Sequence, residues 1–360
     1  MKKFFLLFVL ASVSLASCVN DESLELTQQP KKLSFEAPVM QTQSRALYGE
    51  IQGADYPTAE SFMVFAKQHK GDLTNWESAD NFWETGAQKV EYDASEGAKY
   101  WDTDTDHYWP SGDVKLSFGA YSPAVLNGEA TATYTNAGLT IANFEVNATV
   151  ANQVDLMYSG PILNQTYKDN ATGVSVVFKH ALASIVFSAI DLDDNATYTI
   201  NSIKVNGKFL TKGTFCENLT WNNGNATGTA AWKEVSGDTQ TTEYTLASNL
   251  SISVGQGKTT VITNGNSALL TIPHNATELD DNATVTITYT VVPTSGAANY
   301  VATKTVKLAD FEINTGTHIT SWEMGKRYTY QFSFGGTSKI FFKPTVTTWD
   351  DQTAATLTIN

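Results

Sequence analysis

Short runs of β-branched and aromatic residues, separated by turn-forming residues, constrain the fold of this chain most. Residues 283–291 alternate polar and apolar side chains almost without interruption. A period of two is typical of a strand with one buried face and one wet face. No segment keeps a helical period beyond a few turns. We therefore predict an all-β fold, and the short, evenly spaced runs favour β-sandwiches.

The candidate strands fall into two groups. A polar, turn-rich stretch at 164–172 separates them, and the long apolar run 174–189 follows at once. Asn206-Gly207 lies between two strand-like runs, a pattern typical of a hairpin turn. We predict an N-terminal β-sandwich at residues 46–165 and a C-terminal β-sandwich at residues 166–360. The strands expected in them are 61–66, 89–92, 114–121, 174–189, 198–205, 259–263, 283–292, 300–308, 328–334 and 339–346.

The first residues read as an export signal of the lipoprotein kind. Lys2 and Lys3 supply positive charge, residues 4–13 form an apolar stretch too short to span a bilayer, and small residues precede Cys18. We predict that residues 1–17 are a signal peptide and that Cys18 carries the lipid. Such an anchor would hold the chain on the outer membrane, at the cell surface.

The net charge argues against one class of partner, and the cysteine content argues against disulfide bonds. The formal net charge is −14, so phosphate backbones would repel the chain and we expect no nucleic-acid partner. Cys216 is the one cysteine besides Cys18, so no disulfide is expected once Cys18 is lipidated. We predict a protein stabilised by its cores.

Residues 18–45 stand apart as a lipidated propeptide or tether. Leu33, Phe35 and Ala37 alternate with polar residues, which predicts a single strand. Arg45 follows in a polar stretch, where an exposed arginine is a natural site for a trypsin-like protease. Taken alone, these residues also fit an ordinary tether.

Several patches along nearly the whole chain carry a family resemblance. The first patch is the lipoprotein signal followed by the single strand and Arg45. The others lie at residues 107–112, 115–123, 154–158, 177–185, 322–330 and 340–349. Together they resemble the fimbrillin family of Bacteroides-type bacteria, whose members are subunits or accessory proteins of surface pili.

The resemblance implies two tandem transthyretin-like Greek-key sandwiches that assemble with other fimbrial subunits by strand exchange. A protease would cut between Arg45 and Ala46, releasing a strand that includes Leu33, Phe35 and Ala37, and a strand of the next subunit would fill the groove. The alternating residues Ala355, Leu357 and Ile359 are a possible donor strand. A chain that donates no strand would be a tip or anchoring subunit, and an anchoring subunit would keep its lipid.

Other chemistries have weaker support in the sequence. No catalytic or zinc-binding pattern stands out, so we expect neither an enzyme nor a cofactor. Asp102, Asp104 and Asp106 predict a solvated acidic loop, with calcium as the alternative, because the glycine and closing glutamate of a calcium loop are missing.

Six aromatic residues are clustered in one stretch of the first domain, and we expect them to plug the ends of the sandwich. If exposed, they would instead suit a carbohydrate-binding surface lipoprotein of a glycan-uptake system, or a host receptor: Trp76, Trp83, Trp101, Trp109, Tyr100 and Tyr108.

Overall fold

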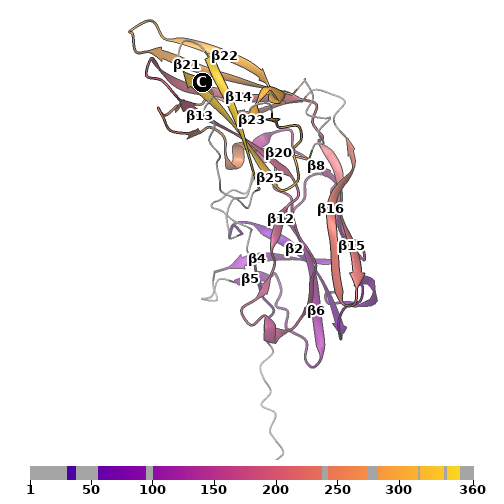
Figure 1. The fold of residues 1–360 in the computed structure, drawn as a ribbon. Helices are drawn as coiled ribbons and strands as arrows, with labels where there is room; N and C mark the ends of the chain where they lie inside the picture. The colour runs from indigo at the N-terminus through magenta and orange to yellow at the C-terminus, as the bar shows by residue number, and fades with distance from the viewer. Residues whose placement is uncertain are drawn as a thin grey trace, which may run out of the picture.

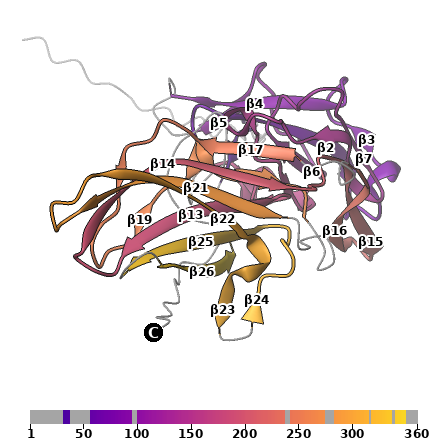
Figure 2. The same ribbon diagram turned by 90° about the horizontal axis from the view of Figure 1, so that it is seen from above.

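The structure is a computed structural model that describes residues 31–37, 56–94, 100–236, 242–273, 283–314, 317–335 and 339–348. These residues form two lobes of stacked β-sheets (Figure 1, Figure 2), and the all-β prediction is confirmed. Helical structure in the described part is limited to single 3-10 turns: η1 (Trp76–Ser78), η2 (Val150–Asn152), η3 (Tyr167–Asp169), η4 (Gly265–Ser267) and η5 (Leu308–Asp310). None of these turns is long enough to cross a bilayer.

The first lobe combines two sheets. The larger sheet has the order β11-β1-β5-β4-β2-β6-β9-β12, with β3 added on β2 and β10 on β6. The smaller sheet has the order β16-β15-β8-β7. The strands are β1 (Phe35–Glu36), β2 (Ser61–Lys70), β3 (Asp80–Asn81), β4 (Ala87–Asp93), β5 (Tyr100–Thr103), β6 (Val114–Ser122), β7 (Thr131–Thr135), β8 (Gly138–Glu145), β9 (Met157–Ser159), β10 (Ile162–Gln165), β11 (Val174–Ser175), β12 (Phe178–His180), β15 (Lys212–Asn222) and β16 (Asn225–Ser236).

The larger sheet buries side chains on both of its faces. Its end strands, β11 and β12, are separated by only two residues of the chain, so the sheet curls almost closed around a core that includes Phe62 and Phe118. The opposite face packs Phe65 and Tyr121 against the smaller sheet. Alternation along β2 and β6 therefore serves two cores, since successive side chains of a strand point to opposite faces.

The second lobe is a sandwich of two five-stranded sheets around one core. One sheet has the order β19-β13-β25-β26 with β20 on β13, and the other has the order β17-β14-β21-β22 with β18 on β14. Beside them lies the ribbon of β23 and β24. The strands are β13 (Ala183–Asp191), β14 (Ala196–Gly207), β17 (Thr242–Ala247), β18 (Ile252–Ser253), β19 (Thr260–Val261), β20 (Leu269–Thr271), β21 (Thr284–Pro293), β22 (Tyr300–Lys307), β23 (Glu312–Asn314), β24 (Thr317–His318), β25 (Lys326–Gly335) and β26 (Lys339–Thr348).

Two local predictions are wrong for a shared reason. The run 174–189 is three strands, because β11 and β12 complete the first lobe before β13 opens the second. Asn206-Gly207 makes no hairpin, because β14 and β15 belong to different lobes and Phe209 and Leu210 enter different cores. In both places the chain passes from one lobe to the other, which a local pattern does not reveal.

The strand pairing also crosses the predicted domain boundary. β15, which lies beyond residue 165, pairs with β8 and holds β16 at the edge of the first lobe. The two lobes meet in a packed core that joins Leu182 and Leu270 to residues of the smaller sheet. The indole N–H of Trp232 donates to the carbonyl of Ala181 at 2.7 Å. The first lobe is therefore not one continuous stretch of sequence.

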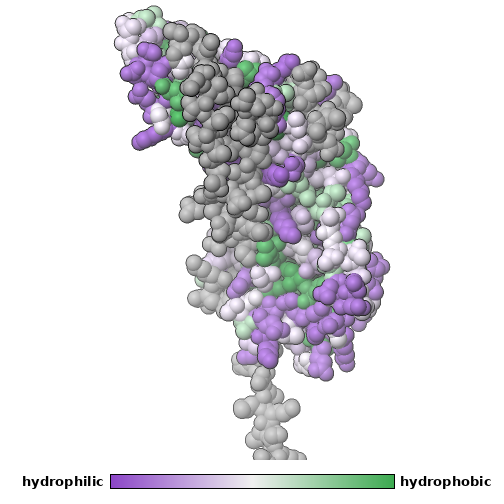
Figure 3. Space-filling model, viewed as in Figure 1, coloured by the Kyte–Doolittle hydropathy of each residue, from purple (hydrophilic) through white to green (hydrophobic). Residues whose placement is uncertain are grey.

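Much of the surface that Figure 3 colours by hydropathy is hydrophilic, but one acidic side chain on β15 is buried. Glu217 is 4 % exposed, and its Oε2 accepts the backbone N–H of Leu139 at 2.8 Å. Burial raises the pKa of this carboxyl to about 7, because the ionised form loses its hydration. Between its unfolded pKa and pH 7, the stability that Glu217 contributes falls as the pH rises.

The interleaved strands predict the behaviour of a fragment. We expect residues 46–165 alone to fail to fold, because β7 and β8 would keep only each other as partners and the core around Phe215 would open. Circular dichroism and limited proteolysis of this fragment, and of residues 31–165 so that β1 is retained, would be compared with residues 31–360. A folded fragment with a cooperative melting transition would contradict the expectation and would support a domain ending at residue 165.

Glu217 predicts a pH-dependent stability difference. Glu217→Gln removes the burial penalty of the carboxylate while keeping an oxygen that accepts the Leu139 N–H. We expect the variant to exceed the wild-type free energy of unfolding by about 2 kcal/mol at pH 8, and by far less at pH 5. Urea titrations of both proteins at each pH provide the test, and equal differences at the two pH values would refute this account.

Candidate functional site

The first strand, β1, is held by backbone hydrogen bonds along both of its edges. Phe35 is paired antiparallel with Trp101 of β5 and parallel with Val174 of β11. The N–H of Leu33 donates to the carbonyl of His107 at 2.7 Å, and the N–H of Val176 donates to the carbonyl of Glu36 at 2.7 Å. The short segment 31–37 is thus an internal strand of the curved sheet.

Alternate side chains of this segment fill the core of the first lobe. Leu33, Phe35 and Ala37 are 1 %, 0 % and 7 % exposed, whereas Glu36 faces solvent. The ring of Phe35 meets those of Phe62 and Phe118 edge to face, at centroid distances of 6.4 and 5.6 Å. The apolar side chains of this segment are therefore fully built into a core formed by residues far along the chain.

A glycine permits the close approach of β1 to its neighbour. Gly173 has φ +137°, and a Cβ placed there would lie 3.0 Å from the carbonyl carbon of Phe35 and 3.2 Å from the N of Glu36. Any other residue would be strained in this conformation and would press on the backbone of β1. Gly173 thus leaves room for the segment. We call the space between β5 and β11 that holds residues 31–37 the slot of β1.

Two lysines precede the buried residues of the segment. The ammonium of Lys32 is paired with Asp102 and, at 3.0 Å, with Asp106. The hydrogen bond to Asp102 raises the pKa of Lys32 well above its usual value. The acidic loop predicted to be solvated therefore faces an ammonium group. Within the described ranges, no group of three or more His, Cys, Asp or Glu side chains is arranged to hold a metal ion.

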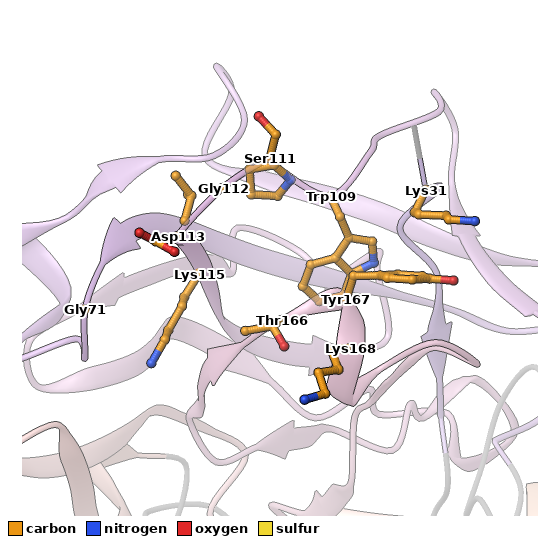
Figure 4. A pocket seen from close by; sticks show the side chains of 12 residues that line it. Lys31, Gly71, Trp109, Ser111, Gly112, Asp113, Lys115, Thr166, Tyr167 and Lys168 are labelled. Atoms are coloured by element: carbon orange, nitrogen blue, oxygen red, sulfur yellow. The ribbon is translucent and has the colours of Figure 1, made fainter. Parts of the chain in front are cut away.

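A cavity of about 640 Å³ opens beside Lys31, the first of these two lysines (Figure 4). Lys31 Nζ lies 5.7 Å from the ring centroid of Tyr167, a cation–π distance, and Tyr167 meets Trp109 edge to face at 6.5 Å. Lys115 and Lys168 also line the cavity. One wall of the cavity thus belongs to the N-terminal segment itself.

The structure places the predicted site residues unevenly. Leu33, Phe35 and Ala37 come together in the first core. The other predicted site residues lie outside the described residues: Cys18, Arg45, Ala46, Ala355, Leu357 and Ile359. The sequence interpretation missed Lys31 and Lys32. A basic pair directly before an alternating strand, in a chain rich in acidic residues, was the available signal.

The fold and site define an all-β protein of two stacked-sheet lobes, with a short N-terminal segment bound into the wall of the first. The family model described as fimbrillin-like matches residues 55–349, and the chain belongs to this family. No curated protein matches it in sequence.

Two solved structures illustrate the likeness. A fimbrial protein from Bacteroides vulgatus is 18 % identical, with a TM-score of 0.55 over 89 % of this chain and 100 % of that one. The tip fimbrial protein Mfa3 from Porphyromonas gingivalis is 10 % identical, with a TM-score of 0.36 over 89 % of this chain and 99 % of that one. The first of these supports the fold.

The buried segment predicts which substitutions weaken the first lobe. We expect Phe35→Ala to lower the free energy of unfolding by about 3 kcal/mol, since it leaves a cavity between Phe62 and Phe118. Gly173→Ala should lower it by about 2 kcal/mol through strain against β1. Urea unfolding measures both.

Glu36→Gln is the matched control, because its side chain is exposed on the same strand, and it should change stability by less than about 0.5 kcal/mol. If Phe35→Ala were as stable as this control, β1 would not be part of the cooperative core.

Proposed function

We propose that this protein is a structural or adhesive fimbrial subunit, or a fimbria-associated surface lipoprotein, assembled by protease-triggered strand exchange. One observation carries the proposal: the segment 31–37 lies between two strands of the first lobe, yet it belongs to the chain upstream of Arg45. A cut between Arg45 and Ala46 would separate that segment covalently from the lobe that it completes.

The physics of the vacated slot favours refilling by another strand. Loss of β1 would expose the backbone groups of β5 and β11 and the apolar trough that now holds Phe35. An incoming strand would pair with both edges and bury its alternate side chains, as in other β-augmentation complexes. Backbone pairing combined with apolar burial gives the slow dissociation that a fibre needs.

The remaining parts of the assembly follow from the sequence. Lipid on Cys18 would deliver the precursor to the outer membrane at the cell surface, and the cut at Arg45 would free the subunit from that anchor. Other fimbrial subunits would be its partners. Residues 353–359, with Ala355, Leu357 and Ile359 alternating, would supply a donor strand in a stalk subunit. An uncut chain would act as an anchor.

Most of the aromatic cluster that the glycan-binding alternative needs is buried. Trp76, Trp83, Trp101 and Trp109 are at most 9 % exposed and pack in the cores of the first lobe, whereas Tyr108 is 43 % exposed. Exposed aromatic faces are what sugar rings stack on, so these side chains favour a structural role. Family membership also favours a fimbrial or adhesive protein over an enzyme.

The maturation step can be tested with an arginine-specific protease. The chain contains only two arginines, and Arg327 lies on β25 with strands paired on both of its sides. We expect one early cut, after Arg45, after which the N-terminal segment exchanges with an excess of a labelled peptide of residues 29–39, as followed by native mass spectrometry. Arg45→Ala should block both the cut and the exchange, while Arg327→Lys should change neither. A cut chain that keeps its own segment in the presence of excess peptide would contradict strand exchange.

A further inference from the structure

We propose that the slot of β1 selects its occupant by two basic residues as well as by apolar side chains. Its partner strand then belongs to a different subunit, one that carries a basic pair directly before three alternating apolar residues. A second copy of this chain, offering residues 353–359, would be a poor donor. This inference rests on the proposed strand exchange and names the chemistry of the partner.

The first recognition contact is the ion pair of Lys32. Its ammonium lies between the carboxylates of Asp102 and Asp106, and the Asp102 side chain is only 11 % exposed. A strand without a cation here would leave Asp102 largely desolvated and facing another carboxylate. Removing one partner of such a half-buried pair costs more than removing one partner of a fully exposed surface pair.

The second contact is made by Lys31 on the wall of the cavity in Figure 4. Its ammonium faces the ring of Tyr167, which is 37 % exposed and is held in place by Trp109. Arginine or lysine at this position would keep the cation–π contact, whereas a small neutral residue would lose it. Lys31 and Lys32 are therefore recognised by different groups: Lys31 by an aromatic ring and Lys32 by carboxylates.

Backbone pairing fixes these contacts in register with the apolar ones. The N–H of Trp109 donates to the carbonyl of Lys31 at 2.9 Å, and Lys32 forms a bridge with Tyr108. A shift of one residue would turn the side chain of Phe35 out of the core. The basic pair must therefore stand immediately before the first apolar residue, as Lys31 and Lys32 stand before Leu33.

The possible donor strand of this chain lacks that pair. When Ala355, Leu357 and Ile359 are set in the places of Leu33, Phe35 and Ala37, Thr353 and Ala354 take the places of the lysines. Two acidic residues, Asp350 and Asp351, lie just upstream, separated from Thr353 by Gln352, in a molecule whose slot already holds acidic side chains. Like charges brought together at an interface oppose association. The charge pattern therefore favours a heterologous donor.

Peptide displacement tests the inference on the whole chain. The protein, cut after Arg45, would be incubated with excess peptides, and loss of its own N-terminal segment would be followed by native mass spectrometry. The peptides are residues 29–39, the same peptide with Lys31→Ala and Lys32→Ala, the same peptide with Glu36→Gln, and residues 351–360. We expect the native and Glu36→Gln peptides to displace equally, and the other two to be at least roughly tenfold weaker.

The acidic side chains give a second measurement. In the variant Asp102→Asn with Asp106→Asn, the advantage of the native peptide over its double-alanine form should shrink to the part due to Lys31. If that variant does not fold, raising the salt concentration to about 1 M should shrink the same advantage in the wild-type protein, because screening weakens the partly exposed ion pair.

The outcomes distinguish basic recognition from strand exchange itself. If the double-alanine peptide displaces the segment as well as the native peptide does, basic recognition is overturned while strand exchange stands. Basic recognition is likewise overturned if residues 351–360 match the native peptide. If no peptide enters the slot, strand exchange itself is overturned and the inference falls with it.

Discussion

The two-sided pairing of β1 is the interaction on which the first lobe depends. A strand at the edge of a sheet is supported on one side only, whereas this segment bonds to β5 and β11 and closes the wall of a nearly closed sheet. Its apolar side chains are buried members of the core. An occupant of this slot is therefore needed for the lobe to be complete, whichever chain supplies it.

The lobe that contains this slot is interleaved along the chain with the second lobe. The first lobe takes strands from both sides of the second lobe's opening strands, so the chain passes between the lobes more than once. The buried pair of Asp155 Oδ2 and His180 Nδ1, 2.9 Å apart, adds polar contact near the passage into β13. Because strands of the two lobes alternate along the chain, contacts between residues distant in sequence hold the lobes together. By contrast, the segment 31–37 stands before the rest of the lobe in the chain.

Charge works on two scales in this protein. The overall excess of acidic residues makes copies of the chain repel one another, which opposes nonspecific association. Against that background, a pair of lysines meeting an acidic loop and an aromatic ring is a specific signal. Such local complementarity provides specificity more than affinity, while the apolar trough provides the affinity.

Local alternation was enough to predict the all-β class, the strand at 283–291 and the inward-facing set Leu33, Phe35 and Ala37, because period-two burial is written into neighbouring residues. The partners of that set were beyond prediction, because Phe118 and Val174 lie far from Phe35 in sequence. The same holds for the carboxylates around Lys32, the glycine against the backbone of β1, and the passage of 174–189 and Asn206-Gly207 between the lobes. The sequence alone determined the all-β class and the apolar face of alternating segments such as β21 and residues 31–37. Only the tertiary structure decided which strands meet, because pairing depends on contacts between distant segments that no local pattern encodes.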